Sequence, residues 1–112
     1  MSLWKGQAAA PADLRQVEAL LRRAVGLDPR FAKGFLELGI LLSDQQRYRE
    51  AILQLQHAAR LEPDLAQAHY RLAQAYQRTG QKAMAAKELE IFERLSARSS
   101  RHELHDTAVA AA

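Results

Sequence analysis

The sequence of 112 residues is long enough for one domain with one hydrophobic core, and its 48% hydrophobic and 26% charged residues exclude a disordered chain. It contains no cysteine, which excludes disulfides and thiolate chemistry and is compatible with either the cytoplasm or the periplasm. The formal net charge of +3 comes from basic residues that alternate with acidic ones, which favours solvated helix surfaces over a nucleic-acid site.

Alanine, leucine, arginine, glutamine and glutamate recur throughout the chain, and these residues favour α-helix. β-Branched residues are few, so strands have little support. The apolar runs are much shorter than the roughly 20 residues of a membrane-spanning helix, and the first residues lack the apolar stretch of a signal peptide. The composition, with few lysines, is typical of a GC-rich bacterial genome. We predict an all-α protein without a membrane span.

The first predicted helix covers residues 14–25. Asp13 and Gln16 have the spacing of a capping box at its start, and Gly26 follows its end. Upstream, only Trp4 and the alanines favour a partner helix around residues 3–10. The apolar residues of the predicted helix recur at helical spacing: Leu14, Val17, Leu20, Leu21 and Ala24.

Residues 32–65 are predicted to form a pair of helices. The first runs from about residue 32 to 43 and is followed by a polar turn. The second runs from about residue 48 to 61 and ends before Pro63, because proline disfavours helical geometry in the residue before it. One apolar face is expected on each helix, formed by Phe35, Leu38, Gly39 and Leu42 and by Ala51, Ile52, Leu55, Ala58 and Ala59.

Residues 66–99 repeat this arrangement at a constant offset, which is the same offset that separates Pro29 from Pro63. Small residues recur where two helices would cross closely, and large residues recur between these crossings. The size-matched pairs include Leu38 with Leu72, Gly39 with Ala73, Leu42 with Tyr76, Ala51 with Ala85, and Leu55 with Leu89.

The spacing of these residues, from Phe35 to Pro63, resembles the tetratricopeptide repeat, a helix–turn–helix unit of about 34 residues. The resemblance implies helix pairs stacked as a short right-handed superhelix, an α-solenoid. It divides the chain into a partial or degenerate first repeat (1–31), two full repeats (32–65 and 66–99) and a tail (100–112). Phe92 and Ala97 stand where the family has alanine and proline, which indicates that no standard repeat follows. For the tail, a capping helix that begins near Ser100 and a frayed end both stay open.

In this family the first helices of successive repeats line a concave groove that receives a partner segment. The resemblance therefore implies a non-catalytic module that binds a protein or peptide. Leu36 and Ile40 lie off the core face, so they contact either a ligand or second copy, or the helix around residues 3–10. Carried over residue by residue, the groove comprises Lys33, Leu36, Ile40, Ser43, Asp44, Gln67, Tyr70, Gln74, Gln77 and Arg78.

Some family members hold a C-terminal carboxylate with lysine, asparagine and arginine residues. Only Arg71 matches that set, and Gln67 stands in the place of a lysine. We therefore expect an extended or helical segment to bind through apolar anchors and amide hydrogen bonds instead. The alternatives are a homodimerisation module and a fragment of a larger repeat protein.

No cofactor, metal site or catalytic residue is predicted. His102 and Asp106 are spaced one helical turn apart, but two ligands alone make a weak metal site. The serines near residue 100 lack a glycine-rich elbow, and no phosphate-binding loop is present. His57 and His69 are isolated, and His69 takes the position of Phe35 in the preceding repeat, which favours a packed structural histidine. The sequence predicts that the protein is not an enzyme.

Overall fold

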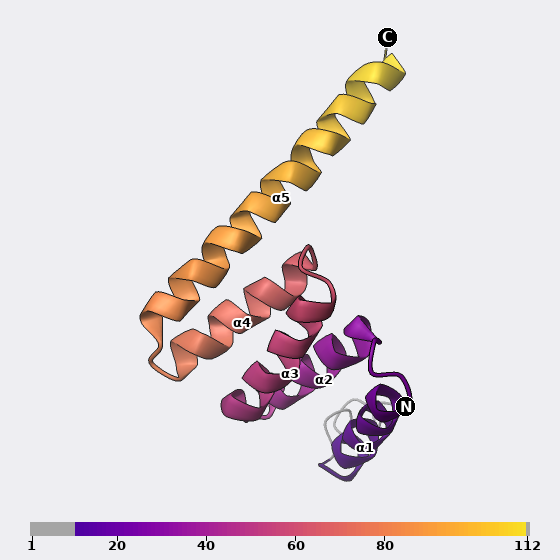
Figure 1. Ribbon diagram of the computed structural model, residues 1–112, viewed down its shortest axis with the longest axis vertical. Helices are drawn as coiled ribbons and strands as arrows, with labels where there is room; N and C mark the ends of the chain where they lie inside the picture. The colour runs from indigo at the N-terminus through magenta and orange to yellow at the C-terminus, as the bar shows by residue number, and fades with distance from the viewer. Residues whose placement is uncertain (1–10, 112) are drawn as a thin grey trace, which may run out of the picture.

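The computed structural model describes the backbone of residues 11–111 and the side chains of residues 13–99. This part of the chain is helical and contains no strand (Figure 1). Each helix packs against the next one along the chain. The helix predicted around residues 3–10 lies outside the described residues. The five described helices are α1 (Pro11–Leu27), α2 (Ala32–Asp44), α3 (Tyr48–Leu61), α4 (Ala66–Arg78) and α5 (Lys82–Ala111).

The repeat is visible in the helix boundaries. α2 begins at Ala32 and α4 at Ala66, whereas α3 begins at Tyr48 and α5 at Lys82, so both pairs of starting points are separated by the same offset. α2 also contacts α4 directly, so the first helices of the two repeats are neighbours. The predicted all-α fold of stacked helix pairs is confirmed.

The turns inside the two helix pairs have the same backbone geometry. Gln46 has a φ of 63°, and Gly80, its counterpart in the next repeat, has a φ of 78°. In each turn the next residue donates a backbone hydrogen bond to the last part of the preceding helix: Arg47 to the Leu42 oxygen at 2.9 Å and Gln81 to the Tyr76 oxygen at 2.8 Å. A positive φ with this hydrogen bond is a common way for a helix to end, and it favours glycine at the position with the positive φ. Only the second repeat has a glycine at that position.

Exchanging the residues at these turns is expected to change stability in opposite directions. Gln46→Gly should raise the free energy of unfolding by about 1 kcal/mol, because a side chain in the left-handed region is strained. Gly80→Gln should lower it by a similar amount. Urea unfolding of both variants measures the effects, and equal signs for the two changes would contradict this account.

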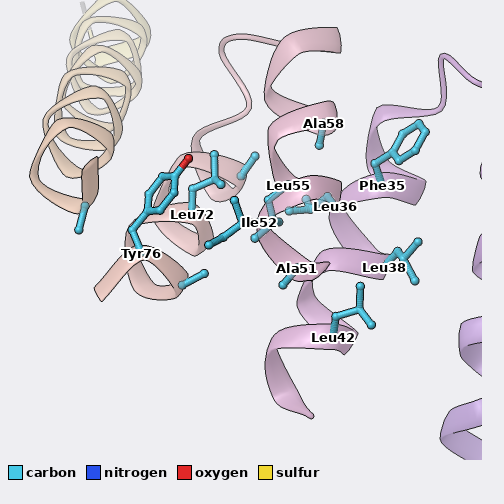
Figure 2. Close-up of a cluster of buried hydrophobic side chains, with 13 residues drawn as sticks. Phe35, Leu36, Leu38, Leu42, Ala51, Ile52, Leu55, Ala58, Leu72 and Tyr76 are labelled. Atoms are coloured by element: carbon cyan, nitrogen blue, oxygen red, sulfur yellow. The ribbon is translucent and has the colours of Figure 1, made fainter. Parts of the chain in front are cut away.

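One hydrophobic cluster joins α2, α3, α4 and the start of α5 (Figure 2). The small residues lie where the helices approach most closely, as predicted. A Cβ atom added to Gly39 would lie 2.6 Å from Cγ and Cδ2 of Leu55, and Ala51 is fully buried. The largest fully buried side chains fill the spaces between these crossings: Leu38, Leu42, Leu55 and Leu72.

Charged residues attach α1 to the first full repeat. Arg47 donates to both carboxylate oxygens of Glu18, at 2.7 and 3.2 Å, and to both oxygens of Glu50, at 2.7 and 3.0 Å. Arg22 donates to Glu18 at 2.9 Å. The hydrogen bonds from Arg47 lower the pKa of both Glu18 and Glu50 below the usual range. Arg47 therefore links α1 to α3.

This link is expected to weaken in acid. Because the pKa of Glu18 is lower in the folded chain than in the unfolded chain, its stabilising effect is complete above a pH of about 4.5 and is lost as the pH falls through the folded-state pKa. The wild type should therefore be more stable than Arg47→Gln at pH 7, and the difference should be smaller at pH 3. Urea unfolding at both pH values measures this, with Arg49→Gln as the control. A difference that is equally large at both pH values would show that Arg47 acts by packing.

α5 is much longer than its counterpart α3. It continues as one helix through residue 100 to Ala111 and projects beyond α4 (Figure 1). A separate capping helix that begins near Ser100 is therefore not formed, and that alternative is wrong. The physical reason is that residues 82–111 contain no proline or glycine that would end the helix.

Candidate functional site

A polar groove lies between the ends of α2 and α4 and the start of α3. Its volume is about 300 Å³. Four of its lining residues come from α4, at positions 71, 74, 77 and 78, and steps of three or four residues place them on one side of that helix. The structure thus brings together five of the predicted groove residues: Ser43 and Asp44 from α2, and Gln74, Gln77 and Arg78 from α4.

Tyr48 and Arg71 also line the groove, although the sequence analysis did not predict them as groove residues. Tyr48 is the first residue of α3, and a rule that takes groove residues only from the first helix of each repeat does not find it. Arg71 carries a signal in the sequence, because it is the one residue that matches the carboxylate-binding set of the family.

Two polar atoms of the groove residues are buried without a hydrogen-bond partner among the described residues. They are Oγ of Ser43 and Nε of Arg71. Buried polar atoms are nearly always paired in folded proteins, because an unpaired one loses its interaction with water without compensation. Both atoms are almost completely closed to solvent, although the two residues line the groove.

The groove offers both donors and acceptors. The guanidinium groups of Arg71 and Arg78 only donate hydrogen bonds, whereas the side-chain amides of Gln74 and Gln77 donate and accept. Asp44 adds one carboxylate, so the lining is mixed in charge. This combination matches the alternating N–H and C=O groups of a polypeptide backbone better than it matches a polyanion.

The predicted groove residues Lys33, Gln67 and Tyr70 are exposed but do not line this groove. Tyr70 is held by its neighbours. Its hydroxyl accepts a hydrogen bond from Nε2 of Gln74 at 3.3 Å, and its ring packs on Phe92 of α5 with the ring centroids 5.0 Å apart. The Tyr70 ring thus connects this face of α4 to α5.

Leu36 is buried, so its prediction as a ligand or self-association contact is wrong, whereas the prediction for Ile40 stays a prediction. Leu36 is only 2% exposed, and Ile40 is partly buried against the same core. The cluster that contains Leu36 also includes Leu55 of α3 and Leu72 of α4 (Figure 2). The reason is that α4 packs beside α2 and extends the core across this side of the helix.

The described residues contain no group of three or more histidine, cysteine or acidic side chains that could hold a metal ion. The side chains of His102 and Asp106 lie outside the described part. Among the described helices none is long and apolar enough to cross a membrane.

Two sequence comparisons identify the repeat. A family model described as "TPR repeat", where TPR stands for tetratricopeptide repeat, matches residues 41–80, which include α3 and α4. The protein O-mannosyl-transferase Tmtc2 of Drosophila melanogaster is 44% identical over 59 residues. These residues are 53% of this chain but 6% of the fly protein.

Solved structures share the fold at low sequence identity. The crystal structure of MamA superposes with a TM-score of 0.76 at 18% identity and covers 80% of this chain, which spans about half (52%) of MamA. SycD, a type III secretion translocator chaperone of Yersinia enterocolitica, has a TM-score of 0.76 at 20% identity and covers 98% of this chain and 75% of its own. With the repeat boundaries, the glycine and alanine crossings and the family match in agreement, residues 41–80 match the tetratricopeptide repeat, and the chain has the fold of stacked helix pairs that such repeats form.

Proposed function

We propose that this protein is a non-catalytic interaction scaffold that binds an extended or helical segment of a partner protein in the groove between α2 and α4. The observation that carries the proposal is the mixed polar lining of this groove, which brings Arg71, Gln74, Gln77 and Arg78 together on one side of α4. Carbonyl or carboxylate oxygens of the bound segment would accept hydrogen bonds from the two guanidinium groups. The two side-chain amides would donate to its C=O groups and accept from its N–H groups.

The comparisons support an interaction role in general terms. The repeat is a stack of helix pairs whose extended surfaces suit binding, and SycD is described as a chaperone. The fly relative is named a transferase, but the matched residues are 6% of that protein. We therefore transfer no enzymatic activity from it to this chain.

The binding proposal is tested by selecting peptides from a random library on the purified chain. A selected peptide should perturb the NMR signals of Ser43, Gln74 and Gln77. Arg71→Gln should weaken its affinity about tenfold or more, because a charged hydrogen bond in a partly buried site is lost. Arg60→Gln is the matched control, because Arg60 is an exposed arginine on α3 outside this groove.

Three outcomes would contradict the proposal. They are a library that yields no peptide above background, perturbed signals that fall on another face, and an Arg71→Gln variant that binds as well as the wild type. Circular dichroism of each variant checks that the helices are retained, so that a loss of affinity is not a loss of fold.

Homodimerisation is a second candidate, and a different observation now supports it. Val17 is 44% and Leu20 is 66% exposed on α1, although Ala51 and Ala85, the counterparts of Val17 in the full repeats, are buried. A second copy that covers these residues would bury them. Light scattering tests this: a dimer that becomes a monomer with Val17→Glu and Leu20→Glu would support it, and a wild-type monomer would exclude it.

A further inference from the structure

His69 of α4 has hydrogen-bond acceptors at both of its ring nitrogens. Nδ1 lies 2.7 Å from Oε1 of Glu88 on α5, and Nε2 lies 2.8 Å from the backbone oxygen of Pro63 in the turn between α3 and α4. The residue is 7% exposed. The ring thus connects α4, α5 and the turn at Pro63, which are separate in the sequence.

The number of protons in this arrangement follows from its chemistry. The carbonyl oxygen of Pro63 can only accept, so Nε2 must carry a hydrogen. A neutral ring then has a lone pair on Nδ1, which faces the carboxylate of Glu88. The short contact between Nδ1 and Glu88 is a hydrogen bond only if a second proton is present, either on Nδ1 or on Glu88. A neutral imidazole beside an ionised carboxylate therefore lacks the proton that this hydrogen bond requires. The bond forms only when the pair carries one additional proton.

The surroundings permit this proton to exchange with solvent. A groove of about 390 Å³ opens beside the pair, and its lining includes both His69 and Glu88. The charged groups that line this groove are Arg60 from α3 and Glu88 from α5. From α4 itself the phenol of Tyr76 lines the groove, and it accepts a hydrogen bond from Gln56 at 2.7 Å.

We propose that one proton shared by His69 and Glu88 fastens α5 to α4 and to the turn at Pro63, and that α5 loosens when this proton leaves. Loss of the proton leaves a ring lone pair against a carboxylate at a place that is largely closed to water, which is unfavourable for the packed state. The fold of the last repeat thus contains a pH-sensitive fastening.

The effect reaches the neighbouring face of α4. Tyr70 follows His69 directly, and its ring packs on Phe92 of α5. A change in how α5 sits would therefore move Tyr70. Tyr70 lies outside the proposed binding groove, so the fastening does not depend on the proposed binding role.

The fastening is tested on the full chain by urea unfolding at pH 5.5 and pH 8.5, the two sides of the range in which histidine side chains exchange their proton. His69→Phe is the reference, because Phe35 occupies the same position in the preceding repeat. Relative to this variant, the folding equilibrium constant of the wild type should be lower at pH 8.5 than at pH 5.5, because the packed state then lacks the shared proton. Glu88→Gln should remove most of this pH dependence, and Glu90→Gln, an exposed glutamate on the same helix, should retain it.

NMR of the unmodified chain gives a second measurement that does not rely on a variant that folds. The ring of His69 should lose one N–H as the pH rises, and the amide signals of residues 85–92 should shift with the same midpoint. A ring that keeps the same protons from pH 5.5 to pH 8.5, or one that titrates while these amides stay unchanged, would overturn the proposal. Equal pH dependence of Glu88→Gln and the wild type would overturn it as well.

Discussion

Replacing Leu55 by alanine is expected to lower the free energy of unfolding by about 3 kcal/mol. Leu55 is fully buried in α3, at the centre of the cluster that joins the two full repeats (Figure 2). Truncation removes apolar surface that is buried on folding and leaves a cavity that the packed helices close only in part. Because a single cluster spans α2 to the start of α5, the loss should destabilise both repeats together.

The matched control lies on the same helix. Leu53 is 62% exposed, so Leu53→Ala should change the free energy of unfolding by less than about 0.5 kcal/mol. Urea unfolding followed by circular dichroism measures both variants. Similar effects for Leu53→Ala and Leu55→Ala would contradict the assignment of Leu55 to the core. A first transition confined to one repeat would contradict the single cluster.

The helical architecture could be predicted from the sequence because it depends on local and periodic signals. Small residues at a fixed offset, such as Gly39 and Ala73, mark helix crossings, and Pro63 marks the end of a helix. These signals act over a few residues or over one repeat length. The length of α5 was less predictable, because it depends on the absence of a stop signal after Ser100 rather than on a pattern that is present.

The candidate groove was predictable only in part, for reasons of geometry. A rule of position within the repeat finds residues such as Gln74 and Arg78, which share one side of α4. It fails for Leu36, because the burial of this side chain depends on how closely α4 packs beside α2. The spacing of residues in the sequence does not determine the distance between these two helices. It also fails for Tyr48, since the side chain enters the groove from a different helix. The hydrogen bonds of His69 are likewise set by Pro63 and Glu88, which no repeat pattern connects.

Adding one methyl group at Gly39 is expected to lower the free energy of unfolding by about 1–2 kcal/mol. The new Cβ atom would lie 2.6 Å from Cγ and Cδ2 of Leu55 and 3.4 Å from the backbone oxygen of Ala51. Since Leu55 is fully buried, it cannot turn away into solvent. Overpacking of this kind costs about 1–3 kcal/mol, and the better helix propensity of alanine offsets up to about 1 kcal/mol of that cost.

Replacing Gly26 by alanine is the control, because the added methyl group does not overlap another side chain there. Gly26 lies within α1, and among the described residues a Cβ atom added there would meet no atom within 4 Å outside its own chain neighbours and helix backbone. Gly26→Ala should therefore raise the free energy of unfolding by up to about 1 kcal/mol through helix propensity alone. Opposite signs for the two glycine variants are the expected result. If Gly39→Ala were also stabilising, the helices of the first full repeat would not approach as closely as the structure shows.

The double variant Gly39→Ala with Leu55→Ala isolates the contact itself. With Leu55 shortened, the atoms that the new methyl group would overlap are gone, and the methyl group partly fills the cavity instead. Gly39→Ala should then be neutral or stabilising, so the double variant should be more stable than the sum of the single effects by at least about 1 kcal/mol. Additive effects would mean that the cost at Gly39 arises elsewhere, for example from the Ala51 backbone. The fit between glycine and leucine would then not determine how closely α2 and α3 pack.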